Sequence, residues 1–222
     1  MDEDIFLPSH NPTMRRILAQ PPAPETMQRL PRAFFERPTL EVARDLLGRR
    51  LVHQIRGRRI SGRIVEVEAY IGEDDQASHA SVGRTARNAV MYGPPGHAYV
   101  YMIYGQHYCL NIVTEPEGFP AAILIRALEP EEGLSWIARR RPGVPARDWL
   151  RGPGRVCAGL GIDRRLNGHD LCAPDARLWI EIGEPVPDDQ VTTGPRVRVR
   201  GDLLARTRPW RFYIRDHPCV SD

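Results

Sequence analysis

The 222-residue chain contains no lysine, and arginine supplies all 31 of its basic residues. A Schiff base needs a primary amine, so no side chain of this protein can form one with a carbonyl carbon. The α-amino group is the one amine left for such chemistry, and it begins a segment with little expected order. The composition therefore excludes covalent catalysis through a side-chain imine.

Cysteine is scarce and widely spaced, and long apolar runs are absent. With no CxxC and no histidine pair at ligand spacing, we expect reduced, buried thiols and no metal site. The start Met-Asp-Glu-Asp lacks the basic and apolar regions of a signal peptide, and no run approaches roughly 20 apolar residues. We expect a soluble, cytoplasmic protein without a membrane segment. The four cysteines are Cys109, Cys157, Cys172 and Cys219.

The composition is otherwise that of a globular domain. Hydrophobic residues make up 41% of the chain and charged residues 27%, which is ordinary for a protein with a substantial core. The net charge of +3 and the isoelectric point near 8.8 allow a polyanionic partner, although solvated arginines explain the same numbers. Charge alone does not identify a partner.

Six prolines within residues 1–31 predict a flexible tail, with one domain over residues 32–222. Hydrophobic periodicity predicts many short strands, a few helices and no regular alternation of the two. The fold class is α+β: one domain with a curved, mostly antiparallel sheet, flanking helices and a protruding β-hairpin. Helices are expected over residues 38–48, 130–141 and 151–161, a long loop over 72–96, and strands over 50–55, 61–70, 121–127, 178–182, 196–200 and 210–214, besides the hairpin at 98–114.

The strand at residues 64–70 carries an unusual pair of acids. Apolar and polar residues alternate, which places Glu66, Glu68 and Tyr70 together on the face opposite the core. Like charges two residues apart repel, and glutamate is a poor strand former. For Glu66 we favour a salt bridge with a nearby arginine. A carboxylate here could also act as a general base and stabilise an oxocarbenium-like sugar.

Six of the seven tyrosines lie between Tyr70 and Tyr108. Tyr104 falls at the tip of the predicted hairpin, where it either folds back onto the sheet or enters a stack of bases as a wedge. Tyr70 and Tyr101 could hold a planar ring between them. Each stack of a base on an aromatic ring contributes about 1–3 kcal/mol, comparable to the few kcal/mol that extruding a base costs.

Two further polar residues stand among strand residues, and each has two readings. Arg126, at the end of a predicted strand, could orient a carboxylate or a water molecule, or could be a solvated arginine. Asn111 could read or exclude a substituent of a base, or could be a satisfied amide of the core.

Together these residues form a series of motifs that resembles the alkyladenine (3-methyladenine) DNA glycosylase family from about Phe34 to the C-terminus. The motifs are Glu-Val-Glu-Ala-Tyr (66–70), Ser-His (78–79), Arg-Asn (87–88), Pro-Gly (95–96), Tyr-Val-Tyr-x-Ile-Tyr-Gly (99–105), Cys-x-Asn (109–111), Arg-Ala-Leu-Glu-Pro (126–130), Gly-Pro-Gly-Arg (152–155), Gly-Pro-Arg-Val (194–197) and Arg-Phe-Tyr (211–213).

The resemblance implies an enzyme that flips a damaged purine out of DNA and hydrolyses its N-glycosidic bond without a cofactor. On this basis Glu68 is the expected general base for water, and Arg126 and the carbonyl of Val197 are expected to hold that water. The lack of lysine agrees with a monofunctional enzyme, which leaves an abasic site and does not cut the strand.

The resemblance also implies how the base is held. Tyr70, His79 and Tyr101 are the expected walls of the base pocket, with the main chain of His79 available for hydrogen bonding. Asn111 is expected to clash with the exocyclic amine of guanine, and Tyr104 to intercalate into the duplex.

The implied partner is double-stranded DNA containing damaged purines, bound by a monomer without a nucleotide cofactor. Arg84, Arg87 and Asn88 are expected to contact the DNA backbone. Gln106 and His107 depart from the methionine and aromatic residue of some relatives, which affects how deeply the hairpin would wedge the strands.

The substrate range is less defined than the reaction. Cationic 3-methyladenine suits stacking tyrosines, whereas the neutral hypoxanthine and ethenoadenine need protonation or a close fit. Arg198 stands where a glycine is common, and its bulk could narrow that range. The alternatives are a module that binds damaged DNA without cutting it, and a domain related to the C-terminal part of formyltransferases.

Overall fold

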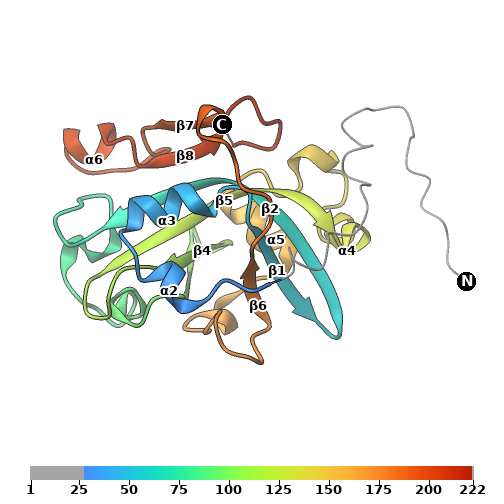
Figure 1. Ribbon diagram of the computed structural model, residues 1–222, viewed down its shortest axis with the longest axis horizontal. Coiled ribbons are helices and arrows are strands. Elements are labelled where there is room, and N and C mark those ends of the chain that lie inside the picture. Colours follow the sequence, from blue (N-terminus) through green and yellow to red (C-terminus); the bar gives the residue numbers. More distant parts are fainter. Residues whose placement is uncertain (1–27, 222) are drawn as a thin grey trace, which may run out of the picture.

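An antiparallel sheet carries the fold in the computed structural model, which describes residues 28–221 (Figure 1). Six strands follow in the order β3-β4-β5-β2-β1-β6, while β8 pairs with β2 and β7 with β8. This confirms the predicted α+β class. The strands are β1 (Arg50–Ile55), β2 (Arg58–Ile71), β3 (Ala98–Ile103), β4 (His107–Val113), β5 (Ala121–Glu132), β6 (Leu178–Glu181), β7 (Val191–Gly194) and β8 (Arg211–Ile214).

The two longest strands, β2 and β5, form the centre of the sheet. Their pairing is irregular between Ile64 and Glu66, where Val65 is an extra residue on β2. Such a bulge bends a strand and increases its twist. On its other edge β2 pairs first with β1, up to Arg63, and then with β8, from Glu66 onward. The bend therefore lies where β2 changes partners.

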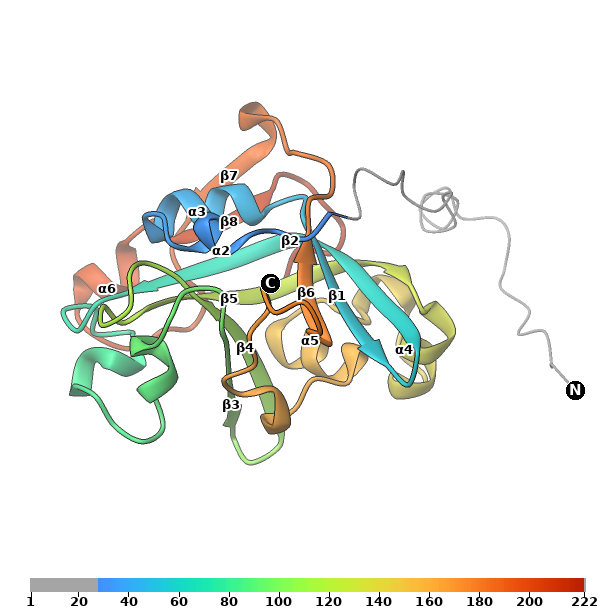
Figure 2. The same cartoon turned by 60° about the horizontal axis from the view of Figure 1, so that its bottom comes forward.

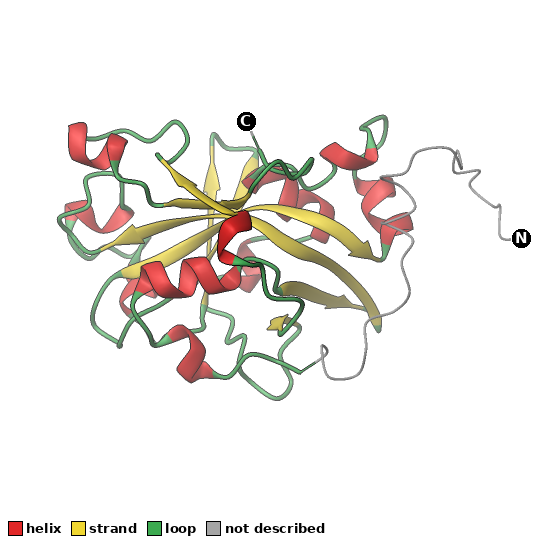
Figure 3. Ribbon diagram, turned by 45° about the horizontal axis from the view of Figure 1, so that its top comes forward, coloured by secondary structure: helices red, strands yellow, loops and turns green. Residues whose placement is uncertain are grey.

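The two longest helices lie on opposite faces of these central strands (Figure 2). Helix α3 (Thr39–Leu46) buries Val42, Ala43 and Leu46, and α5 (Pro153–Leu160) buries Val156, Cys157 and Leu160. Because both faces are covered, β5 is buried over nearly its whole length. The remaining helices are short and flank the sheet (Figure 3): α2 (Arg32–Phe35), α4 (Leu134–Arg140) and α6 (Leu203–Thr207).

The helix expected over residues 130–141 begins four residues late, at Leu134. Residues 130–132 continue β5 instead, because Glu131 pairs with Arg50 of β1 and Glu132 with Arg59 of β2. The sequence pattern predicts that these acids lie in a first helical turn. The structure shows that they belong to an ionic network across the sheet.

The strand expected over residues 196–200 is wrong, and β7 at Val191–Gly194 takes its place. Arg196 is buried, and Arg198 has a φ of 54°, which no strand residue adopts. The loop expected over residues 72–96 contains two single-turn 3-10 helices, η2 (His79–Val82) and η3 (Ala89–Tyr92).

The chain before α2 lies along the edge strand β6. The N–H of Leu30 donates to Ile180 O at 2.9 Å, the N–H of Ile182 donates to Gln28 O at 3.0 Å, and the Leu30 side chain is buried. The expected flexible tail otherwise lies outside the described residues. Within residues 28–221 no helix is long and apolar enough to cross a membrane.

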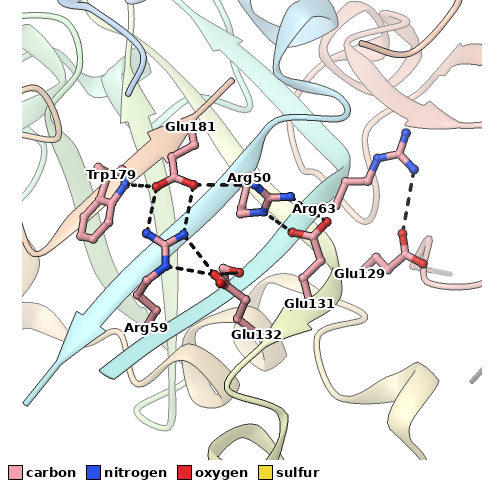
Figure 4. A network of polar contacts seen from close by, with 9 residues as sticks. Arg50, Arg59, Arg63, Glu129, Glu131, Glu132, Trp179 and Glu181 are labelled. Atoms are coloured by element: carbon pink, nitrogen blue, oxygen red, sulfur yellow. Dashed lines mark hydrogen bonds and ion pairs between the residues drawn. The ribbon is translucent and has the colours of Figure 1, made fainter. Parts of the chain in front are cut away.

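A network of ion pairs joins β1, β2, β5 and β6 at one end of the sheet (Figure 4). At its centre Glu181 is buried and accepts hydrogen bonds from Arg59 Nη1 at 3.0 Å and Nη2 at 3.1 Å, and from Trp179 Nε1 at 2.8 Å. Arg59 also donates to Glu132 at 3.1 Å. The network neutralises a carboxylate that would be costly to bury alone.

We expect Glu181→Gln to lower the free energy of unfolding, because Arg59 then loses a charged partner in a buried position. The loss should be roughly 3 kcal/mol, near the low end for breaking a buried pair since Arg59 is partly exposed and keeps Glu132. Urea denaturation measures it, with Glu117→Gln on an exposed turn as the control. Equal stability of the two variants would contradict this reading of the network.

Candidate active site

The two acids of β2 are both fully buried, and each is surrounded by donors. Glu66 accepts hydrogen bonds from Arg126 Nε at 3.0 Å, from Arg211 Nε at 2.6 Å and from the N–H of Ser221 at 2.7 Å. Two cations thus offset one anion. The expected salt bridge of Glu66 is confirmed, and it ties β2 to β5, β8 and the C-terminal segment.

Glu68 has a different set of partners. Its Oε1 accepts from the N–H of Val197 at 2.6 Å and lies 3.3 Å from Arg126 Nη1, while its Oε2 accepts from the hydroxyl of Tyr70 at 2.8 Å. Donors on both oxygens fix the orientation of the carboxylate. Among the described partners of Glu68, Arg126 alone is cationic, and Glu66 shares it.

Arg126 links the two acids. It reaches Glu66 through Nε and Glu68 through Nη1, and its Nη2 donates to Ser221 Oγ at 2.9 Å. Burial acts to lower the pKa of Arg126, but the charges of Glu68 and Glu66 outweigh it and raise the pKa. The interpretation of Arg126 as a solvated arginine is wrong, because its side chain is buried and orients two carboxylates.

Val197 meets Glu68 through its N–H. The sequence resemblance implies a role for its carbonyl in holding water, which stays a prediction. The N–H contact was missed because the loop was expected to be a strand, in which a backbone N–H pairs with another strand.

The aromatic residues expected to line the base pocket come from β2, β3 and η2. The rings of His79 and Tyr101 touch, with centroids 4.4 Å apart and planes at 63°. Rings this close cannot hold a base between them, so they can form one wall, with Tyr70 available as the other. His79 Nδ1 is hydrogen bonded to the hydroxyl of Tyr99 at 2.8 Å. Sequence reasoning missed this role of Tyr99, which its position two residues from Tyr101 could have suggested.

Tyr70 is held by groups of opposite charge. Its hydroxyl donates to Glu68, and the guanidinium of Arg196 lies 4.7 Å from the centroid of its ring. Burial and the nearby Glu68 charge raise the pKa of Tyr70 well above its usual range, so the hydroxyl keeps its proton for this hydrogen bond.

Asn88 lies inside the loop of His79. Its amide nitrogen donates to His79 O at 2.8 Å and to Gly83 O at 2.9 Å, and its amide oxygen accepts from the N–H of Thr85 at 2.6 Å. The side chain is buried and used within the loop, so the expected contact of Asn88 with a DNA backbone receives no support. Arg84 and Arg87 are exposed.

Asn111 lies opposite Tyr99 in the pairing of β3 with β4. It is buried, and its amide nitrogen donates to Tyr99 O at 3.2 Å. The reading as a satisfied core amide is supported to this extent. Its expected role in excluding a base substituent stays a prediction.

Tyr104 is 88% exposed at the tip of the β3–β4 hairpin, which extends away from the central strands (Figure 2). The interpretation of a tyrosine folded back onto the sheet is wrong. Tyr104 and Gly105 both have positive φ, 50° and 67°, as in the tight turns that match the twist of paired strands. An aromatic residue is strained in this conformation, and such strain clusters at functional sites.

We expect the imidazole of His79 to titrate below pH 6.5, because burial and then the positive charge of Arg87 lower its pKa. The ring is therefore neutral at pH 7 and gains charge in acid. NMR titration of the His79 ring signals in wild type and Arg87→Ala measures this, and the variant should show the higher pKa. The control is Arg84→Ala. A wild-type midpoint at or above 6.5, or no change in Arg87→Ala, would contradict the explanation.

Comparison with known proteins places this chain in one family. The family model described as methylpurine-DNA glycosylase matches residues 33–218. A protein named "Putative 3-methyladenine DNA glycosylase" from Methanocella arvoryzae is 53% identical over 193 residues, 86% of this chain and 95% of its own length. Proteins of the same name are 45% identical over 202 residues in Alkaliphilus oremlandii, covering 87% and 98% of the two chains, and 49% identical over 194 residues in Streptomyces avermitilis, covering 86% and 90%. The chain therefore belongs to the methylpurine-DNA glycosylase family and is a DNA glycosylase.

Proposed function

We propose that this enzyme flips 3-methyladenine out of duplex DNA and hydrolyses its N-glycosidic bond, with Glu68 as the general base. The observation that carries the proposal is the setting of Glu68. It is a buried carboxylate with both oxygens oriented by donors, and it is hydrogen bonded to the tyrosine that offers a wall for a base.

The reaction needs no cofactor. Water attacks C1′ of the sugar, its proton passes to Glu68, and the bond from C1′ to the purine nitrogen breaks. A 3-methylated adenine carries a positive charge in the nucleotide and leaves as the neutral base, so that its departure needs no acid. The negative charge of Glu68 also favours the oxocarbenium-like transition state.

Stacking on aromatic rings offsets the free energy that flipping the base costs. Extruding a base costs a few kcal/mol, and stacking it on an aromatic ring returns about 1–3 kcal/mol. Tyr70 on one side and the touching rings of His79 and Tyr101 on the other supply two such surfaces. A cationic purine gains about 0.5–2 kcal/mol more from the face of a tyrosine. Hypoxanthine and ethenoadenine lack that charge, and we propose them as slower substrates.

The exposed residues around these rings suit a duplex. Tyr104 would take the place of the extruded nucleotide, as side chains that distort DNA do. Arg84 and Arg87 are exposed on the loop of His79, and the Arg87 guanidinium lies 5.7 Å from the Tyr101 ring centroid. We assign both arginines to phosphate contacts. One flipped base needs one active site, and we propose a monomer.

The proposal is tested with duplexes carrying a single hypoxanthine or ethenoadenine, and with alkylated DNA that contains 3-methyladenine. Wild type should release 3-methyladenine fastest, and strands should break only after alkaline heating because the chain has no lysine. Glu68→Gln should abolish release while binding to lesion DNA changes by less than about tenfold, or 1.4 kcal/mol. Binding by wild type without release would make this a damage-binding module, and release by Glu68→Gln would remove Glu68 from its role.

We expect Tyr104→Ala to slow excision from duplexes more than from single strands, since a wedge acts where a paired base must be extruded. Single-turnover rates on one lesion in both contexts measure the effect. Met102→Ala removes another exposed side chain of the hairpin and serves as the control. An equal loss on both substrates would show that Tyr104 does not act as a wedge.

A further inference from the structure

Asp75 and Arg196 form a buried ion pair next to the active site. Arg196 Nη1 lies 2.5 Å from Asp75 Oδ2 and Nη2 lies 2.7 Å from Oδ1, and both side chains are fully inaccessible to solvent. A pair in such a place contributes little net stability unless its remaining hydrogen-bonding groups are also satisfied. Since stability alone does not explain the pair, the groups that it contacts indicate its role.

Arg196 fastens the end of β2 to the C-terminal part of the chain. Its Nη1 also donates to Ala69 O at 2.9 Å, and its Nη2 to Ala205 O in α6 at 3.0 Å. The guanidinium lies 4.7 Å from the ring centroid of Tyr70 and 5.1 Å from that of Trp210. The ring of the tyrosine that is hydrogen bonded to Glu68 thus lies against this cation.

Asp75 shapes the loop that leads to His79. Its carboxylate accepts hydrogen bonds from the N–H of Ala77 at 3.2 Å and, more weakly, from that of Ile71 at 3.4 Å. Its carbonyl accepts from the N–H of Ser78 at 2.7 Å. These contacts fix the backbone up to the residue before His79, and with it the start of the second aromatic wall.

The peptide bond after Arg196 carries the N–H that meets Glu68 at 2.6 Å. The loop over residues 195–200 is paired with none of the described strands. Arg198 turns the chain away with a φ of 54°. The buried side chain of Arg196 therefore anchors the loop beside Glu68.

We propose that Asp75 and Arg196 are positioning residues for base excision. The pair sets the Val197 N–H against Glu68 and holds Tyr70 and the His79 loop in one arrangement. The inference rests on the proposed role of Glu68. A positioning role differs from a purely stabilising one, in which the two charges would compensate each other and contribute nothing to the reaction.

The test compares Asp75→Asn, Arg196→Met and the double variant. Each single change leaves one buried group without its charged partner, whereas the double change removes both charges. We expect the double variant to melt at a higher temperature than Arg196→Met. Its single-turnover release of 3-methyladenine should still be slower than wild type by about 100-fold, as a misplacement near 1 Å costs. Binding to lesion DNA should change by less than about fivefold, because an interaction needed only in the transition state lowers the rate without weakening binding.

The pH profile separates positioning from stability. The Val197 N–H is a donor to the ionised carboxylate, so losing it should move the acidic limb of the pH–rate profile to higher pH. Among the described residues, the other titratable or charged groups around Glu68 keep their side chains in these variants. They are Glu66 and Tyr70 on β2, Arg126 on β5, Cys109 on β4 and Arg211 on β8. A change in stability alone would leave the limb in place.

Two reference variants keep the outcomes distinct. Glu181→Gln breaks the buried pairs at the other end of the sheet (Figure 4), and it should lose stability while keeping the wild-type rate and pH limb. Glu68→Gln should be inactive. A double variant with wild-type rate and pH limb, beside an inactive Glu68→Gln, would overturn the positioning role alone. Activity in Glu68→Gln would overturn the proposed function itself.

If the double variant does not fold, Asp75→Asn decides the matter at reduced temperature. It is nearly isosteric and keeps one acceptor for Arg196. We expect a slower rate and a shifted acidic limb in this variant as well, while an unchanged rate and limb would overturn the proposal.

Discussion

Two carboxylates buried side by side on β2 are the constraint on which the rest of the structure depends. Both lie out of water, and their charges repel, so the fold must bring cations and N–H groups to them. Arg126 comes from β5, Arg211 from β8 and the N–H of Ser221 from the C-terminal segment. Distant parts of the chain thus converge because Glu66 and Glu68 need partners.

Glu66 and Glu68 have different partners, and these partners indicate different roles. Glu66 receives two arginines and a backbone N–H, which leaves it neutralised and fixed. Glu68 shares one of those arginines and otherwise has a hydroxyl and a backbone N–H, which orient it without a cation of its own. The same strand therefore supplies a structural residue and, two positions on, the proposed base.

The sequence was sufficient where the local pattern determines the structure. Alternation over residues 64–70 predicted both β2 and the shared face of its acids, and the hairpin with Tyr104 at its tip followed from the tyrosine-rich strands. Long-range contacts could not be predicted in this way. Asp75 stands next to Glu73 and Asp74, and nothing local indicates which acid meets Arg196. Residues 130–132 read as a helix start because their arginine partners lie on other strands.

The central claim is that Glu68 is the catalytic base and Glu66 the structural carboxylate. The most direct measurement compares Glu66→Gln with Glu68→Gln by thermal melting and by single-turnover release of 3-methyladenine, at a temperature where both are folded. We expect Glu66→Gln to lose about 3–5 kcal/mol of stability and still release base well above background. Glu68→Gln should melt closer to wild type and release none. Release by Glu68→Gln together with a folded, inactive Glu66→Gln would contradict the account.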